Sequence, residues 1–383
     1  MAPLRGYLLD QAMRSRNAEA DEVHRCLLEL GHAWTALSEA AEDDEATGTV
    51  ERLRLWPLAW RIRKLGLRHH LTLAAPFWGW SEVSPSPGTV FFAGGARLNA
   101  AVSAACEERG LRVRAAPPGG GPGAARWDDL RSSAIGVFDL TGRSTTERAS
   151  VCHALGLGLA LGVYPVVVTG ERENLPFDID VEPVTDELLL ADRIDQALFR
   201  VHPTTGASSV AATARRVLGE RAPADPVEAH RLVRLRLQDE RRSGEAVLTP
   251  VWPARYADPA APRCFHIMPF SQPWSDTVRD QVREACRRSG TSYRRGDDAD
   301  GTDVIRAIWE EIGLATCLVV DLTGLNMNVC LELGLAQALG RPTLLFTQDD
   351  PAKTLFPEIA KLQVRRYAPG DGRLANLAMQ APS

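Results

Sequence analysis

The segment ATCLVVDLTGLNMNVCLELGLAQALGRPTLLF, residues 315–346, decides the fold of this chain. An apolar run precedes DLTG, a stretch of helical periodicity follows it, and a second apolar run, TLLF, ends the segment. Short apolar runs that alternate with helices are typical of parallel strands buried on both faces. The segment therefore predicts a strand, a helix and a second strand of an α/β sheet.

An earlier part of the chain repeats this pattern. Residues 134–168, AIGVFDLTGRSTTERASVCHALGLGLALGVYPVVV, share the apolar run, DLTG, VC, LGL and the closing apolar run, with four extra residues after the first DLTG. Self-similarity of this kind indicates a duplicated structural unit.

The repeat extends upstream of both DLTG segments. GTVFFAGG at Gly88 and CFHIMPF at Cys264 are further apolar runs, and each precedes an amphipathic segment, at residues 98–109 and 274–288. Each copy alternates strands and helices over about 100 residues. The predicted fold class is therefore α/β, with two tandem flavodoxin-like (Rossmann-like) parallel-sheet domains.

The remaining sequence divides the chain into four parts. Residues 1–84 are expected to form an N-terminal accessory segment that is largely helical, with helical spacing of apolar residues at 18–40. Residues 85–185 hold the first copy, and residues 261–383 hold the second. Between them, residues 186–260 combine helical periodicity with a proline-rich stretch, TPVWPARYADPAAPR, that is typical of a linker.

Composition excludes several classes of protein. Apolar residues make up 45% and charged residues 24%, which is typical of a globular protein. The net charge of -5 gives no basic footprint, so duplex nucleic acid is not an expected partner. The N-terminal sequence lacks the apolar core of a signal peptide, and no stretch reaches 18 apolar residues, so we expect no membrane partner and a cytoplasmic location.

The seven cysteines are scattered, odd in number and never in CxxC spacing. This arrangement predicts reduced thiols rather than a disulfide framework or a structural zinc site, and we expect no metal. The acidic loop at residues 297–303 favours a solvated loop, with Asp303 capping the following helix, over metal binding.

Candidate site residues follow the strands of the second copy. In open parallel sheets, ligands bind beyond the carboxyl ends of the strands, where helix N-termini also point. The residues at these positions are Met268, Pro269 and Phe270 after the first strand, Asp303 after the second, Asp321, Thr323, Gly324, Asn326 and Asn328 after the third, and Glu332 on the next helix.

These strings resemble the nucleoside 2-deoxyribosyltransferase-like and TIR-like proteins of bacteria. HIMPF, DLTGLNMNVCLELGLAQALGRP and FPEIAKLQVRRY carry the resemblance, over about 105 residues of the second copy and, in degenerate form, over the first. In that superfamily, a glutamate near the start of the helix after the DLTG-type strand lies beside a sugar bound to a base. The resemblance implies cleavage or transfer at the N-glycosidic bond of a nucleoside, nucleotide or NAD-like substrate, without a cofactor. The alternative is a non-catalytic nucleotide-sensing module in a bacterial defence or signalling system.

The resemblance also implies roles for individual residues. Glu332 would attack the anomeric carbon or stabilise an oxocarbenium-like centre, so we expect it to be ionised and open to a ligand. Asn326 and Asn328 would orient that carboxylate or hold sugar hydroxyls, and Met268 and Phe270 would form a wall against the base. The other substrate-binding positions that it implies are Pro269, Asp303, Thr323 and Gly324.

Structural explanations remain open for two of the acids and for one histidine. Glu332 could be a helix N-terminal acid favoured by the dipole, and Asp321 could be either a catalytic carboxylate or the cap of the DLTG turn. His266, inside an apolar run, is expected to be a packed core histidine.

The chain also departs from the family pattern. Deoxyribosyltransferases carry acidic residues where this chain has Asn326 and Thr316, so proton delivery to the leaving base is unexplained unless Asp321 or Asp303 substitutes for them. In the first copy, Ala154 stands where Glu332 stands in the second. Sites in this superfamily are often completed by a neighbouring subunit, which implies a homo-oligomer or, alternatively, pairing of the two copies within one chain.

Overall fold

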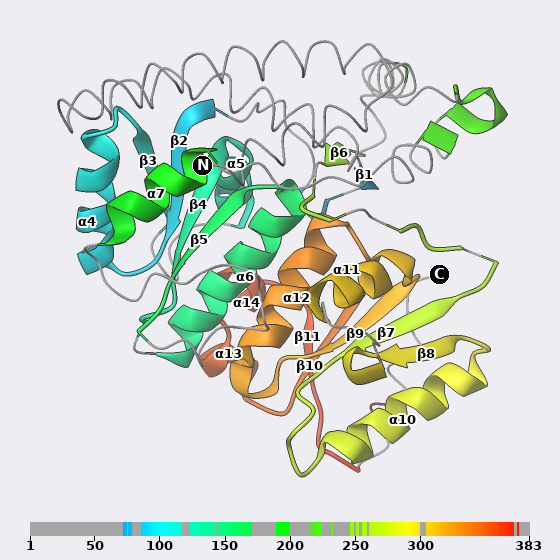
Figure 1. Ribbon diagram of the computed structural model, residues 1–383. Coiled ribbons are helices and arrows are strands. Elements are labelled where there is room, and N and C mark those ends of the chain that lie inside the picture. Colours follow the sequence, from blue (N-terminus) through cyan, green and yellow to red (C-terminus); the bar gives the residue numbers. More distant parts are fainter. Residues whose placement is uncertain are drawn as a thin grey trace.

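Two parallel β-sheets with interleaved helices make up most of the described part of the chain (Figure 1). The computed structural model describes residues 86–116, 123–142, 144–170, 189–199, 260–298 and 304–370, with shorter pieces at 72–74, 76–78, 214–215, 218–223, 246–248, 250–252 and 255–258 and single positions at 232 and 374. The prediction of two tandem flavodoxin-like sheets is confirmed. The helix predicted at residues 18–40, most of the predicted helical connection and Asp303 lie outside the described residues.

The first copy, here called unit 1, forms a four-stranded sheet in the order β3-β2-β4-β5. All its neighbouring strands are parallel. Every residue of β4 and β5 is buried, as expected for strands covered on both faces. Its elements are β2 (Ser86–Ala93), α4 (Ala96–Glu107), β3 (Arg112–Ala116), α5 (Gly123–Arg131), β4 (Ser133–Asp139), α6 (Thr145–Leu161), β5 (Tyr164–Val168) and α7 (Leu190–Phe199).

The second copy, unit 2, forms a five-stranded parallel sheet in the order β11-β10-β9-β7-β8. Counted along the unit this is the flavodoxin-like order 2-1-3-4-5, whose ligand crevice lies between its first and third strands, here β7 and β9. Its elements are β7 (Arg263–Ile267), α10 (Ser275–Arg288), β8 (Ser292–Arg295), α11 (Val304–Leu314), β9 (Cys317–Asp321), α12 (Met327–Ala338), β10 (Thr343–Thr347), α13 (Pro351–Thr354), α14 (Pro357–Ala360) and β11 (Val364–Arg366).

The two units pack through their equivalent helices, α6 and α12, which lie side by side between the sheets (Figure 1). A Cβ atom on Gly156 would lie 2.1 Å from the Leu331 carbonyl oxygen, and one on Gly334 would lie 2.3 Å from the His153 carbonyl oxygen. Gly156 and Gly334 are the same glycine of the repeated LGL string, and His153 and Leu331 are also equivalent. The contact is therefore self-complementary, and the units pair about a pseudo-two-fold axis, as identical subunits do in a dimer.

A short arm before each unit obeys the same symmetry. β1 (Thr72–Ala74) and β6 (Ala246–Leu248) pair antiparallel, each against the full length of the other. Three residues further on, Phe77 N donates to Gln337 O and Val251 N donates to Leu159 O, both at 3.0 Å. Each arm thus binds the end of the other unit's central helix.

A tryptophan follows in each arm. Trp78 lies 5.9 Å from Trp127 of α5, and Trp252 lies 6.2 Å from Trp309 of α11, measured between ring centroids. The strings PFW at 76–78 and PVW at 250–252 are therefore part of the repeat. The duplicated unit extends further towards the N-terminus than the DLTG segments indicate.

The helix crossing predicts that a single methyl group is destabilising at either glycine. Gly156→Ala and Gly334→Ala should each lower the free energy of unfolding by about 1–3 kcal/mol or more, because the added carbon meets backbone that cannot rotate away. Urea unfolding followed by circular dichroism measures the change. Gly170→Ala is the matched control, since a Cβ atom there meets nothing within 4 Å.

The double variant tests whether the two glycines share one contact. Its loss should be smaller than the sum of the single losses, because separating the helices once relieves both clashes. Additive losses, or single variants as stable as Gly170→Ala, would contradict the close crossing.

Candidate functional site

Glu332 lies on α12 at the carboxyl end of β9, beyond the first turn of the helix. α12 begins after its N-cap residue, Asn326, whose Oδ1 accepts hydrogen bonds from Asn328 N at 2.9 Å and Val329 N at 3.3 Å. The first turn of α12 carries no acidic residue. Since the helix dipole acts mainly within the first turn, it does not account for a carboxyl group at position 332.

The Glu332 side chain is buried without a polar partner. Its exposed fraction is 3%, and among the described residues none forms a hydrogen bond or an ion pair with it. Burial alone raises the pKa of Glu332 to about 8. The neutral acid therefore predominates at pH 7, whereas the sequence led us to expect an ionised carboxylate open to a ligand.

The equivalent position in unit 1 has the opposite character. Ala154 is fully buried there, and Ser150, one helical turn earlier, contacts a buried ion pair. Arg126 Nη2 lies 2.7 Å from Glu358 Oε1 of α14, and Arg126 Nη1 donates to Ser150 Oγ at 2.9 Å. Ser150 Oγ in turn donates to Glu358 Oε2 at 3.4 Å. In the corresponding region of unit 1, a buried ion pair thus joins the two units.

The position of Arg126 explains why Glu332 lacks a counter-ion. Trp127 and Trp309 are equivalent in the repeat, so Arg126 corresponds to Ile308 of α11. An apolar side chain stands in unit 2 where unit 1 has its guanidinium. A buried arginine ion pair would have indicated an architectural Glu332, and the described residues provide none.

A buried histidine closes the pseudo-symmetric interface beside the ion pair. His153 Nε2 lies 2.7 Å from Gln337 Oε1, and its ring centroid lies 5.4 Å from Phe356 and 5.9 Å from Trp78. Burial lowers the pKa of His153 to about 4, so the imidazole is neutral and acts as a packed hydrogen-bonding group.

Asp321 caps the DLTG turn at the end of β9. Its Oδ1 accepts hydrogen bonds from Thr323 N and Thr323 Oγ1, and its Oδ2 accepts one from the Tyr367 hydroxyl. In unit 1, Asp139 accepts from Thr141 N and Oγ1 in the same way. Because unit 1 keeps this turn without the glutamate, the turn by itself explains an aspartate at this position, and a catalytic role for Asp321 stays a prediction.

The neighbouring loop residues also form hydrogen bonds within and between the loops. Thr323 Oγ1 accepts from Gln348 N at 3.0 Å, and Gly324 N donates to Asp349 Oδ2 at 2.7 Å. Gly324 has a φ of 70°, which favours glycine there. The structure thus brings the predicted residues Asp321, Thr323, Gly324 and Asn326 together in one loop, where their polar groups hold the loop itself.

Of the three predicted residues after β7, only Phe270 presents its side chain to solvent. Met268 is buried in the apolar core beside Val278, and Pro269 is buried, with its carbonyl accepting from Ser275 Oγ at 2.7 Å. Phe270 is 42% exposed. Met268 therefore packs inside the unit, contrary to the expected wall against a base.

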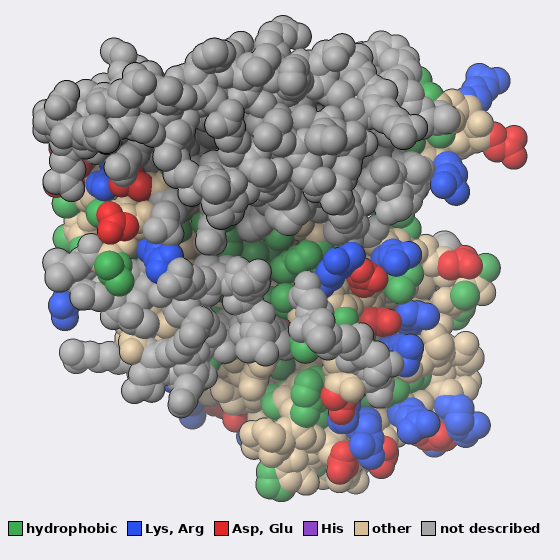
Figure 2. Space-filling model, viewed as in Figure 1, with side chains coloured by type: hydrophobic (Ala, Val, Ile, Leu, Met, Phe, Trp, Pro, Cys, Tyr) green, Lys and Arg blue, Asp and Glu red, His purple; other side chains and the backbone are tan. Residues whose placement is uncertain are grey.

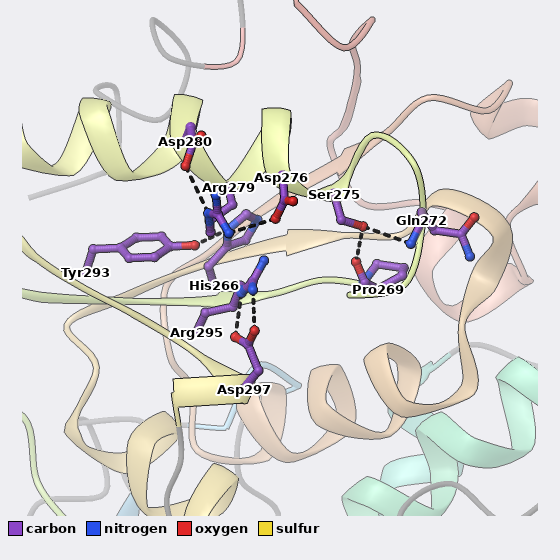
Figure 3. A network of polar contacts seen from close by, with 10 residues as sticks. All are labelled: His266, Pro269, Gln272, Ser275, Asp276, Arg279, Asp280, Tyr293, Arg295 and Asp297. Carbon is purple, nitrogen blue, oxygen red and sulfur yellow. Dashed lines mark hydrogen bonds and ion pairs between the residues drawn. The ribbon is translucent and has the colours of Figure 1, made fainter.

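Phe270 lies on a guanidinium that the sequence analysis did not identify. The Arg295 Cζ atom is 5.1 Å from the Phe270 ring centroid, and Arg295 pairs with Asp297 (Figure 3). The string RRGDD, whose arginines end β8, indicated such a residue, because a basic residue at the carboxyl end of a strand lies at the edge of the sheet where ligands bind. The exposed aromatic ring is therefore held in place by a cation.

His266 packs inside the sheet, as predicted. It has no exposed surface, and its Nδ1 lies 2.9 Å from the Tyr293 hydroxyl (Figure 3). Burial, and secondarily the charge of Arg295, lowers the pKa of His266 to about 3.

Comparison with known proteins gives no relative for this chain: no family model, no curated protein and no solved structure matches it.

Within the described ranges, no cluster of three His, Cys, Asp or Glu side chains is arranged to hold a metal ion. No helix among those described is long and apolar enough to cross a membrane. On the face seen in Figure 2, basic and acidic side chains intermingle over the described part of unit 2.

The raised pKa of Glu332 predicts a stability that falls with pH. The folded protein holds this proton more tightly than the unfolded chain, whose value is 4.5, so the contribution is complete below pH 4.5 and lost as the pH rises to about 8. Between pH 5 and pH 9, the free energy of unfolding of wild type should fall by several kcal/mol more than that of Glu332→Gln, as measured by urea unfolding. Glu107→Gln, at an exposed position on α4, is the control and should follow wild type. Parallel curves for wild type and Glu332→Gln would rule out the raised pKa.

Proposed function

We propose that unit 2 cleaves, or transfers at, the N-glycosidic bond of a nucleoside, nucleotide or NAD-like substrate through Glu332. The observation that carries this proposal is a buried carboxyl group with no partner among the described residues and a pKa raised to about 8. Such a group destabilises the fold, and strongly perturbed pKa values cluster at functional sites. The equivalent position in unit 1 holds Ala154 beside a satisfied ion pair, so the repeat itself does not require an acid there.

The raised pKa changes the role that Glu332 takes in this proposal. A neutral carboxylic acid donates a proton, so Glu332 would protonate the leaving base as the glycosidic bond breaks. The acidic residues that deoxyribosyltransferases use are replaced by Asn326 and Thr316, and Thr316 Oγ1 bonds the Arg263 backbone at the opposite end of β9. In this proposal Glu332 is the proton donor in place of those residues.

Phe270 is the best-placed residue to bind the base. It follows β7, which neighbours β9 in the sheet, so both strands end at the same crevice. An exposed ring that already lies on Arg295 can stack a base without a further loss of side-chain freedom. Since Glu332 is 3% exposed, contact with the sugar requires part of its cover to move when the substrate binds.

The test is base release from a panel of nucleosides, nucleotides and NAD. Glu332→Gln keeps the size of the side chain and removes the proton, so turnover should fall by about 100-fold or more, the usual contribution of a general acid. The wild-type rate should decline as the pH rises through about 8, where Glu332 ionises. Glu107→Gln, distant in sequence and exposed, should retain the wild-type rate. Equal rates for wild type and Glu332→Gln would remove this mechanism.

The alternative is a module that binds a nucleotide without turnover. It is favoured by one observation: burial is the only cause of the raised pKa of Glu332, so no charged group among the described residues acts on it as a neighbouring nucleophile or base would. Calorimetry with the same panel separates the two functions. Binding that Phe270→Ala weakens, with no base released, would establish the sensor; base release that depends on Glu332 would exclude it.

A further inference from the structure

Three cysteines of unit 2 converge at the end of the sheet opposite to the candidate site. Cys264 of β7 and Cys317 of β9 are register partners on neighbouring strands, near the amino ends of both. Cys286 lies near the C-terminal end of α10, in the same apolar cluster as Cys264. A strand pair and the helix that covers it thus bring three thiols together.

The thiols lie close together. Cys264 and Cys286 belong to one apolar cluster, and Cys317 packs against that cluster beside its register partner Cys264. Cys264 and Cys286 are 1% and 6% exposed, whereas Cys317 is only partly buried, so Cys317 is the most accessible thiol of the three. Their arrangement does not suit a metal ion, which leaves the chemistry of the thiols themselves.

The described thiols also differ in pKa, and therefore in the fraction present as the reactive thiolate. The hydrogen bond from Cys264 lowers the pKa of Cys317 and of Cys286, while the same contacts raise that of Cys264. The other buried thiols differ: burial raises the pKa of Cys106 to about 12 and also raises those of Cys152 and Cys330. Since the thiolate is the reactive form, oxidation should select the three-thiol cluster.

We propose that this cluster is an oxidation site, at which a peroxide converts Cys317 to a sulfenic acid and Cys264 closes a disulfide with it. In the first step the Cys317 thiolate attacks the peroxide O–O bond, which yields the sulfenic acid and releases hydroxide or alkoxide. In the second step the Cys264 sulfur displaces the sulfenic hydroxyl, and its proton leaves with that hydroxyl as water. The peroxide is reduced by two electrons, and the two thiols become one disulfide.

The choice of Cys264 as the second thiol follows from its position. It is the register partner of Cys317 on the neighbouring strand, so the pairing of the two backbones keeps it beside the sulfenic acid when side chains rotate. The new bond would tie β7 to β9, the two strands between which the crevice of unit 2 opens at their other ends.

Peptide mapping of the full-length protein tests the proposal without any substitution. After brief treatment with hydrogen peroxide and alkylation of the remaining thiols, the peptides of Cys264 and Cys317 should appear as one species lighter by two hydrogens. Dithiothreitol should separate them again. Cys106, Cys152 and Cys330 should remain alkylatable after denaturation.

Two variants identify the order of events. In Cys264→Ser the disulfide should be lost, and a dimedone adduct should accumulate on Cys317. Cys286→Ser is the matched control, since it removes a neighbouring buried thiol and leaves both partners in place, so the Cys264–Cys317 bond should still form. A Cys264–Cys286 bond, oxidation of Cys106 as fast as that of Cys317, or no intrachain bond would each overturn the proposal.

Discussion

The close crossing of α6 and α12 is the contact on which the rest of the structure depends. Each helix presents a glycine to a backbone carbonyl of the other, so the two units approach to a distance that no side chain would allow. The same axis relates the paired β1 and β6 strands and the two arm hydrogen bonds. A single chain therefore reproduces the interface of a two-fold dimer, and the two central helices are buried along most of their length.

Because the units are related in this way, their differences are informative. Arg126 and Glu358 join the units in a buried ion pair, which is expensive to break because either group alone would be an uncompensated buried charge. In unit 2, Ile308 takes the position of that arginine, and Glu332 takes the position of Ala154. In unit 1 the charged groups at this position thus pair with each other. In unit 2 a buried acid without a polar partner lies at the edge where ligands bind in such sheets.

Much of the fold could be predicted from the sequence, because local patterns determine it. The two DLTG segments and the apolar runs before them predicted both parallel sheets, and the helices at α4 and α10 begin within two residues of their predicted positions. The pairing of the units could not be derived, since LGL does not reveal which backbone its glycine meets. The PFW and PVW strings also belong to the repeat, but three residues are too short a match to indicate it. The contacts of Trp78 with Trp127 and of Trp252 with Trp309 show the equivalence.

The site was predicted less well, because the protonation of its acids and the hydrogen bonds of its side chains depend on neighbours that are distant in sequence. Asp321 contacts Tyr367 only in the folded sheet, and the pKa of Glu332 is raised because burial removes water without supplying a polar partner.

The most direct test is the infrared carboxyl band of Glu332, isolated as the difference between wild type and Glu332→Gln from pH 4 to pH 10. A protonated band that disappears near pH 8 is the predicted result, and a group that titrates near its ordinary value of 4.5 would contradict the central claim.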